Sequence, residues 1–359
     1  MSSALAPHTT AAPGAISGWF PRIDDAVPPV LAIWRIAVSP WLGQAAYAVA
    51  RLGIADLLAA GPQSSAELAA AAGVDVPTLH RVLRFLASVG LFAQTGDGRF
   101  AATPVSACLT RRAPNSLRDL LILTGEEFHR AWGGILASLE AGEPAFRRVF
   151  DDDFFGYLDA HPACARTFHG AMAGAIHLRA GTLARHYDFG YARTLVDVGG
   201  GSGVVLASIL RRYPHLRGVL CDLPAAAAAG AEYLAAAGLA DRCEIVAGSF
   251  FDAVPAGGDL YLVSQVVHLL DDEEAVALLG RCRAAMPERA RLLLVEAVVP
   301  EDEGDADVNG LDLHMLVLFG GRERTAREFR ALLAGAGYRL GSIIPLPQTG
   351  TCVVEATLS

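Results

Sequence analysis

Residues able to bind a ligand gather in a glycine-rich run at positions 194–203. A β-branched, apolar segment ends there in Asp197, and glycines follow at Gly199, Gly201 and Gly203. This order predicts a strand, a tight turn and a helix. Glycine lets the backbone adopt positive φ or lie directly against a ligand, and the start of a helix offers unpaired N–H groups. We therefore predict a nucleotide-binding turn; a purely structural glycine turn is the alternative.

The spacing of the glycines narrows the kind of nucleotide. A dinucleotide-binding turn requires glycines at relative positions one, three and six, but the sixth position here is Val204. The Gly-Lys-Ser/Thr sequence of a phosphate-binding loop is absent as well. The remaining pattern, Asp-x-Gly-x-Gly-x-Gly, resembles the loop of class I methyltransferases that binds S-adenosyl-L-methionine (SAM). The next predicted strand ends in Asp222, whose carboxylate could accept both ribose hydroxyls.

His268 follows the fourth predicted strand and could act as a base. Neutral imidazole can accept a proton from a phenol near pH 7. The alternative is a histidine that is buried or capped for structural reasons. Ligands of doubly wound sheets bind at the carboxyl ends of the strands. The side chains predicted at such ends are Asp197, Asp222, Ser249, Phe250, Ser264, His268 and Glu296.

The elements that must position these side chains alternate between strand and helix. This alternation predicts an α/β fold with a doubly wound, mostly parallel sheet and a terminal antiparallel hairpin. Beyond the two strands already described, the predicted strands are residues 243–247, 259–263 and 291–298, and the hairpin pairs residues 341–345 with 352–357.

The N-terminal part of the chain carries helical patterns. The predicted elements are helices at residues 42–58, 65–72 and 78–89 and a β-ribbon at 91–102, which together form a winged helix-turn-helix. A DNA-binding reading would place Thr78, His80, Arg81 and Arg84 on a recognition helix. The net charge of −9 opposes it, because phosphate neutralisation requires a basic face. The exposed apolar N-terminal helices instead favour a homodimer.

A helical bridge is predicted between the two parts, with helices at residues 117–139, 154–158 and 164–186. Phe155, Phe168 and Met172 belong to an aromatic and methionine-rich stripe in this bridge. Such a stripe either packs in a core or covers an aromatic substrate, and the sequence leaves both possibilities open.

Composition limits the class of protein. Of the 359 residues, 53% are hydrophobic and 19% are charged, which is typical of a globular protein of about two domains. The six cysteines are scattered without a Cys-x-x-Cys pair, as expected for thiols in a reducing cytoplasm. Neither a signal peptide nor a membrane span is predicted, and no metal ion or nucleic-acid partner is expected.

Six runs, in order along the chain from about residue 20 onward, resemble the small-molecule O-methyltransferases. This family includes caffeate and hydroxyindole O-methyltransferases and actinobacterial enzymes that tailor polyketides. The resemblance implies a winged-helix dimerisation domain, a Rossmann-like catalytic domain, SAM as methyl donor and S-adenosyl-L-homocysteine as its product. The matching runs are residues 197–203, 221–224, 248–251, 266–268 with 271–273, 295–296 and 320–325.

The resemblance implies a domain order and a catalytic group. We expect a disordered tail at residues 1–17, a winged-helix dimerisation domain at 18–113, a helical bridge at 114–187 and a SAM-binding catalytic domain at 188–359. His268 would remove the proton of the acceptor hydroxyl, and Glu296 and Glu323 would flank it and fix its tautomer. For Glu323, a salt bridge with Arg322 or Arg324 is the alternative.

The resemblance also implies the residues that bind SAM and the acceptor. The glycines would approach the methionine part of SAM, Asp222 would bind the ribose, and Phe250 would pack on the adenine. The cofactor-binding set is Asp197, Gly199, Gly201, Gly203, Asp222, Leu223, Ser249, Phe250 and Ser264. The substrate set is Phe155, Phe168, Met172, Asn309, Asp312, Met315 and Phe319, with His314 as a further candidate.

Four positions depart from the family pattern. Ser249 stands where many relatives have an acid for the adenine amino group, and a hydroxyl accepts a weaker hydrogen bond than a carboxylate. Ser264 replaces a lysine that is common in plant members. Leu269 and Leu270 replace an Asp-Trp pair after the histidine, which makes the neighbourhood of His268 more apolar.

Three hypotheses about function follow. The leading one is SAM-dependent methylation of a phenolic or similar hydroxyl on an aromatic natural product. The second is a SAM-binding relative that catalyses another reaction, such as decarboxylation, hydroxylation or a pericyclic step. The third is a DNA-binding regulator that uses the winged helix. Labelled methyl transfer separates the first from the second, and salt-sensitive DNA binding would favour the third.

Overall fold

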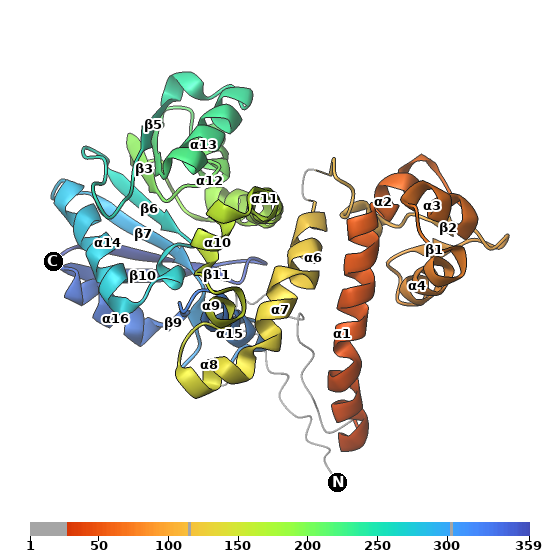
Figure 1. Ribbon diagram of the computed structural model, residues 1–359. Coiled ribbons are helices and arrows are strands. Elements are labelled where there is room, and N and C mark those ends of the chain that lie inside the picture. Colours follow the sequence, from red (N-terminus) through yellow and green to blue (C-terminus); the bar gives the residue numbers. More distant parts are fainter. Residues whose placement is uncertain (1–26, 114–115, 302–303) are drawn as a thin grey trace, which may run out of the picture. The chain divides into compact units, whose positions relative to one another are not determined.

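The computed structural model describes residues 27–113, 116–301 and 304–359 of the chain (Figure 1). The predicted tail at residues 1–17 lies outside them. The chain divides into two compact units. The described residues of one run from 27 to 177, and those of the other run from 178 to 359.

The first unit begins with a long helix and a small helical core. Its first elements are α1 (Pro29–Leu52), α2 (Ile54–Leu57), η1 (Leu58–Ala60), α3 (Ser65–Ala72), α4 (Val76–Ser88), β1 (Ala93–Gln94), β2 (Phe100–Ala101) and α5 (Pro104–Ala107). Leu68, Leu83, Phe92 and Phe100 pack in the core of this unit. The β1–β2 pair is antiparallel; the name winged helix stays an interpretation of α3, α4 and this ribbon.

The helix predicted at residues 42–58 has different bounds. α1 starts at Pro29 and continues through Pro40, and Gly53 ends it with a φ of 70°. Proline is accommodated at the first helical position because its missing N–H would have no partner there. Left-handed backbone at Gly53 then separates α1 from α2.

The single helix predicted at residues 117–139 is wrong, because the structure has three short helices there. These are α6 (Arg118–Gly125), α7 (Glu127–Gly133) and α8 (Ile135–Ala141). The backbone leaves helical geometry at Glu126, between α6 and α7, where φ is −109° and ψ is −98°. Its carboxylate accepts from the Tyr47 hydroxyl at 2.9 Å and pairs with Arg51 at 3.1 Å. Tertiary contacts of Glu126 with α1 therefore override the helical pattern.

The rest of this unit is helical and rich in aromatic contacts. It comprises α9 (Ala145–Phe150), α10 (Phe154–Ala160) and the first part of α11 (Pro162–His186), which continues into the second unit. Phe154 is buried and packs edge-on against Phe146 and Phe168, at ring-centroid distances of 5.1 and 5.0 Å. Part of the predicted aromatic stripe is therefore core.

The second unit is built on a seven-stranded mixed sheet in the order β10-β11-β7-β6-β3-β4-β5. Its strands are β3 (Thr194–Val198), β4 (Arg217–Asp222), β5 (Cys243–Ala247), β6 (Leu260–Ser264), β7 (Arg291–Glu296), β10 (Tyr338–Leu346) and β11 (Thr351–Leu358). Strands β3 to β7 are parallel, and β10 and β11 form an antiparallel hairpin, as predicted. The strand order reverses direction between β3 and β6, which is where ligands of such sheets bind.

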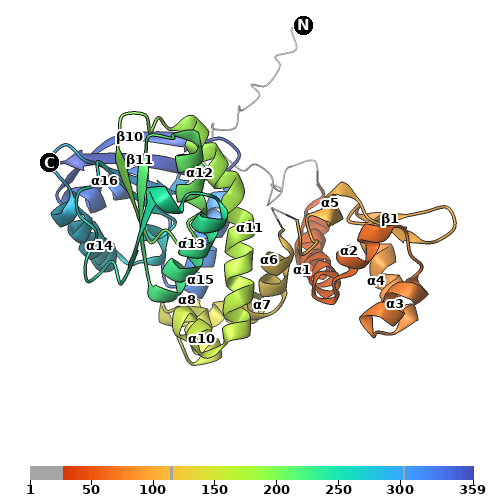
Figure 2. The same ribbon diagram turned by 90° about the horizontal axis from the view of Figure 1, so that it is seen from above.

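Helices cover both faces of this sheet (Figure 2). They are α12 (Val204–Arg212), α13 (Pro224–Ala236), η2 (Ala240–Arg242), α14 (Asp272–Ala285), α15 (Ala306–Leu318) and α16 (Ala326–Gly335), with the short pair β8 (Val298–Val299) and β9 (Arg324–Thr325) beside them. Leu278 and Leu279 of α14 and Phe329 and Leu333 of α16 pack in one core with the buried side chains of the strands. This core holds the carboxyl ends of the strands in fixed positions.

Candidate active site

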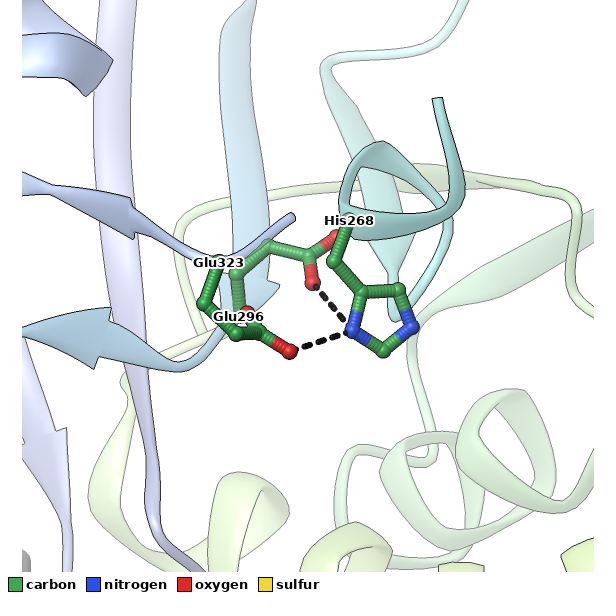
Figure 3. A group of neighbouring side chains, drawn as sticks. All are labelled: His268, Glu296 and Glu323. Atoms are coloured by element: carbon green, nitrogen blue, oxygen red, sulfur yellow. Dashed lines mark hydrogen bonds and ion pairs between the residues drawn. The ribbon is translucent and has the colours of Figure 1, made fainter. Parts of the chain in front are cut away.

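His268 lies in a short turn, η3 (Val267–Leu269), which follows β6. The side chain is 7% exposed, and its Nδ1 lies 2.7 Å from Oε1 of Glu323 and 3.8 Å from Oε2 of Glu296 (Figure 3). A carboxylate beside Nδ1 holds the proton on that nitrogen. The other ring nitrogen, Nε2, points away from both carboxylates in Figure 3. In this tautomer, Nε2 has the free lone pair of a base.

Glu296 is the last residue of β7 and is fully buried. Its Oε1 accepts from the backbone N–H groups of Val266 and Val267 at 3.1 and 3.0 Å, and its Oε2 accepts from Gln265 Nε2 at 3.1 Å. Gln265 has a φ of 55°, a conformation that non-glycine residues seldom adopt. Glu296 therefore ties the end of β7 to the turn that bears His268.

Glu323 lies just before β9, and a different element fixes it. Its backbone N–H donates to Oδ1 of Asp312 on α15 at 2.8 Å. Asp312, predicted as a substrate contact, thus supports the backbone of Glu323. The second carboxylate oxygen, Oε2, is buried without a hydrogen-bond partner in the described part of the chain.

The two arginines beside Glu323 do not pair with it. Arg322 and Arg324 both bind Asp272 instead, at 2.6 and 2.9 Å. Glu323 pairs with His268, so the alternative of a salt bridge with these arginines is wrong for this structure.

Arg324 fixes the turn around His268, a contact that the sequence analysis missed. Its buried guanidinium donates to the carbonyls of Val267 and Leu270 at 2.8 and 2.9 Å. The N–H of Arg322 donates to the His268 carbonyl at 2.9 Å. Gly321 lies so close to that carbonyl that a Cβ would collide with it. The backbone is therefore held on both sides of the imidazole.

Charges around His268 favour its protonated form. Burial lowers the pKa of His268, but the charges of Glu296 and Glu323 together with the Glu323 hydrogen bond raise it by more, so the net direction is upward. Burial raises the pKa of Glu296, and the charge of His268 lowers it by less. The imidazole therefore holds a proton more tightly than an ordinary histidine.

The glycine turn follows β3 and has the conformation that glycine permits. Gly199, Gly201 and Gly203 have φ values of 69°, 57° and 73°. A Cβ at Gly199 would lie 2.8 Å from Val266, beside the His268 turn, and 3.6 Å from the ring of Phe250. A Cβ at Gly201 would meet open space. The turn thus lies close to the end of β6 and leaves room above Gly201.

Acidic side chains flank this turn. Oδ2 of Asp222 accepts from the Gly201 N–H and Oδ1 accepts from the Leu223 N–H, both at 2.7 Å. Both oxygens of Asp197 are buried without a hydrogen-bond partner among the described residues. Burial and the charge of Asp222 raise the pKa of Asp197 to about 7. Two carboxylates beside an open turn suit a ligand that carries hydroxyls and positive charge, as SAM does.

The other predicted cofactor residues lie at neighbouring strand ends. Ser249 and Phe250 are partly buried after β5, and the Ser249 hydroxyl accepts from the Phe251 N–H at 3.2 Å. The hydroxyl of Ser264, at the end of β6, is buried without a partner in the described residues. Leu223 is 56% exposed and could cover an adenine ring. All lie at the carboxyl edge of the sheet.

The predicted substrate contacts are divided between the units. In the second unit, Asn309 is exposed, Met315 is buried and Phe319 is partly buried at the end of α15. Burial and the His268 charge lower the pKa of His314 to about 4. In the first unit, Phe155 and Met172 are 47% and 38% exposed, and the partly buried Phe168 has its ring centroid 6.5 Å from that of Phe155. Their roles stay predictions.

His268, Glu296 and Glu323 place ligand atoms within 4.8 Å of one another, as a metal site would. The atoms that would bind a metal ion already form hydrogen bonds. Glu296 accepts from three N–H groups, and Nδ1 of His268 pairs with Glu323. The expectation of no metal ion stays a prediction.

The proposed DNA-reading helix is α4. The ring of His80 bonds the Ser65 hydroxyl at 2.8 Å and packs edge-on against Phe100, so it serves its own domain. Arg81 and Arg84 are exposed.

Comparison with protein families gives two adjacent matches. Residues 132–339 match the O-methyltransferase domain, and residues 34–112 match the O-methyltransferase dimerisation domain. Within the described residues, no helix is both long enough and apolar enough to cross a membrane.

Individual proteins are similar over nearly the whole chain. Phenazine O-methyltransferase PhzM of Lysobacter antibioticus is 44% identical over 331 residues, which cover 92% of this chain and 97% of that protein. The crystal structure of LaPhzM has a TM-score of 0.89 at 43% identity and covers 93% of this chain and 100% of its own. The structure of the O-methyltransferase NcsB1 from neocarzinostatin biosynthesis, in complex with SAM and 2-hydroxy-5-methyl naphthoic acid, has a TM-score of 0.77 at 33% identity and covers 88% and 96%.

Proposed function

The chain belongs to the SAM-dependent O-methyltransferase family, and from this membership we propose that His268 acts as the general base in methylation of an aromatic natural product. The group methylated is a phenolic or similar hydroxyl. A phenazine enzyme and a naphthoic acid complex among the relatives support an aromatic acceptor.

The geometry of His268 is the observation that carries this proposal. The ring is buried, its Nδ1 is fixed by Glu323 at 2.7 Å, and the turn beneath it is held by Arg324. Nε2 is then free to take the proton of a hydroxyl placed before it. Glu323 and Glu296 stabilise the imidazolium that forms, because their negative charges favour the protonated ring. Deprotonation raises the nucleophilicity of the acceptor oxygen.

SAM supplies an activated methyl group on a sulfonium sulfur when it is bound. We propose that Gly199, Gly201 and Gly203 allow its close approach and that Asp222 accepts hydrogen bonds from its ribose. Phe250 and Leu223 would pack on the adenine ring. Ser249 and Ser264 would contribute hydroxyls, and Asp197 would add negative charge beneath the turn. The open space above Gly201 and the unpaired Asp197 support this placement.

Both units contribute to the proposed enzyme. The dimerisation domain would occupy residues 18–113, the bridge 114–187 and the catalytic domain 188–359. Exposed Phe155 and Met172, with Phe168, would contact the acceptor from the bridge, and Asn309, Met315 and Phe319 would do so from α15. We place the enzyme in the cytoplasm, because its six cysteines are all free thiols.

Methyl transfer is tested with SAM labelled on its methyl group. Purified protein is incubated with labelled SAM and a panel of phenolic phenazines, naphthoates and benzoates. We expect label in an acceptor, as a methyl ether. His268→Ala should lower kcat by about 10²–10⁴-fold, while the affinity for S-adenosyl-L-homocysteine should stay unchanged.

The same experiment separates the alternatives. Conversion of an acceptor without incorporation of label would favour the repurposed relative. Full activity of His268→Ala would contradict the general-base role. Glu244→Gln is the control, because its exposed side chain lies on edge strand β5 outside the proposed site.

A further inference from the structure

Arg179 on α11 carries a charge that the described protein does not pair. No hydrogen bond or ion pair joins its guanidinium to another described residue, and its Nε is buried without a partner. The side chain as a whole is partly buried. Removing a cation from water without pairing it costs free energy. An arginine in this state is therefore a candidate for ligand binding.

The direction of α11 places Arg179 toward the carboxyl edge of the sheet. Gly181, Ala184 and Arg185 of α11 line a cavity together with Ser208, Arg211 and Arg212 of α12. α12 begins at the glycine turn, so its last residues lie away from the carboxyl edge. α11 ends before β3 starts, so it runs in the same direction. Arg179 precedes Arg185 by roughly 9 Å of helix rise, toward the carboxyl edge.

The charge of Arg179 acts on the catalytic group. The charges of Glu296 and Glu323 act on its guanidinium, and its own charge opposes protonation of His268. Neither carboxylate is close enough to form an ion pair with it. Each has other donors, since Glu296 accepts from Val266, Val267 and Gln265, and Glu323 accepts from His268. The guanidinium therefore lies near His268 and forms no ion pair with either carboxylate.

We propose that Arg179 binds a carboxylate of the acceptor, close to the hydroxyl that His268 deprotonates, so that the acceptors are aromatic hydroxy acids. The inference rests on the proposed function of His268. Nε and one terminal nitrogen form a two-donor edge that matches the two oxygens of a carboxylate. Pairing with the acceptor removes the cost of the unpaired cation and fixes the orientation of the ring before His268.

A structural role for Arg179 predicts something different. If it only moderates the charge of Glu296 and Glu323 through space, Arg179→Lys, which keeps the cation, would bind acidic and neutral acceptors as the unmodified protein does. Carboxylate recognition instead predicts an effect limited to acidic acceptors. The two roles are separated by paired ligands that differ only in the carboxylate.

The test measures binding by calorimetry to the full chain saturated with S-adenosyl-L-homocysteine. The pairs are 3-hydroxy-2-naphthoate with 2-naphthol and salicylate with phenol. We expect the unmodified protein to bind an acid at least about 10-fold more tightly than its neutral counterpart, as for a charged hydrogen-bonded pair. Arg179→Met should remove this preference and leave the affinity for the neutral ligand within about 2-fold. Arg179→Lys should restore only part of it.

Arg185→Met is the matched control. Arg185 lies on the same helix, α11, but it is exposed and lines a cavity with the last residues of α12, away from the carboxyl edge of the sheet. It should keep the preference for the acids. Thermal unfolding of each variant checks that Arg179→Met is folded. Absence of any acid preference in the unmodified protein, or equal losses for both members of a pair, overturns the inference. Failure of methyl transfer with the acid preference intact would instead refute the proposed function.

Discussion

The proton affinity of His268 should set the pH dependence of the enzyme. Its pKa lies above the ordinary value of 6.5, because the charges of Glu296 and Glu323 outweigh the lowering effect of burial. A general base must be unprotonated, so kcat should rise with pH through this raised pKa. Glu323→Gln removes one negative charge, which should move the rise to lower pH by about one unit.

The same variant should also lower the maximal rate. An amide at position 323 can hold Nδ1–H but stabilises the imidazolium less, and kcat should fall by about 10²–10⁴-fold. The measurement is a pH profile of kcat for both proteins under saturating SAM. A profile that stays in place after Glu323→Gln would show that Glu323 does not govern the proton affinity of the base.

Asp197 should make SAM binding depend on pH. Burial and the charge of Asp222 raise the pKa of Asp197 to about 7, so the carboxylate is protonated at lower pH and charged at higher pH. It lies beneath Gly200, where a Cβ would approach its Oδ2 to 2.7 Å, so its charge acts on the ligand through the turn. We expect SAM affinity to increase several-fold as pH rises through this value.

Asp197→Asn should flatten that dependence. A neutral analogue, 5′-methylthioadenosine, lacks both the sulfonium and the ammonium group and should bind with little change over the same pH range. Calorimetric titration of both ligands at several pH values gives the comparison. An equal pH dependence for both ligands would rule out charge recognition by Asp197.

Some of these residues could be predicted from sequence and others could not. His268 follows one predicted strand and Glu296 lies near the end of another, so their meeting at one edge follows from parallel topology. Gln265 and Arg324 carry no such signal, because their roles depend on backbone carbonyls and a positive φ that only the folded chain creates. Asp312 was predicted to contact the acceptor, and its hydrogen bond with the Glu323 backbone was not foreseen.

At the scale of elements, the turn η3 depends on Arg324. Arg324→Met would leave the carbonyls of Val267 and Leu270 without these donors, which should lower the free energy of unfolding by about 2–4 kcal/mol. The freed turn should also misplace His268 and lower kcat more than it weakens SAM binding. Denaturant unfolding and steady-state kinetics measure the two effects.

Arg322→Met is the matched comparison. Arg322 binds the same Asp272, but both side chains are about half exposed, at 45% and 56%, and such pairs contribute at most about 1 kcal/mol. Equal behaviour of the two variants would contradict a special role for the buried arginine.

The elements themselves were predicted unevenly. The glycine turn, the parallel strands and the terminal hairpin follow from local patterns, and the hairpin strands only extend further, to residues 338–346 and 351–358. The break between α6 and α7 depends on Glu126 meeting Tyr47 and Arg51. Those partners are some 75 residues away in the sequence, so helical periodicity alone favours one continuous helix.

At the scale of the whole molecule, the chain is two compact units joined within α11. A helix of 25 residues that continues from one unit into the other leaves no linker to recognise in the sequence. The helical patterns therefore predict a bridge but contain nothing that would place a division at residue 177. The predicted boundaries at residues 113 and 187 stay proposals.

The dimerisation domain exposes apolar side chains that a second copy would cover. Ile33, Trp34, Ile36 and Trp41 of α1 are 54–65% exposed, which is unusual for residues of this size in a monomer. A double substitution, Trp34→Glu with Trp41→Glu, would place two charges in the interface and should weaken dimerisation at least about 100-fold. Sedimentation over a range of concentrations should then show monomer where the unmodified protein is dimer. Leu139→Glu on α8, also an exposed apolar residue at 70%, should leave the dimer intact, and an unchanged dimer in the tryptophan variant would place the interface elsewhere.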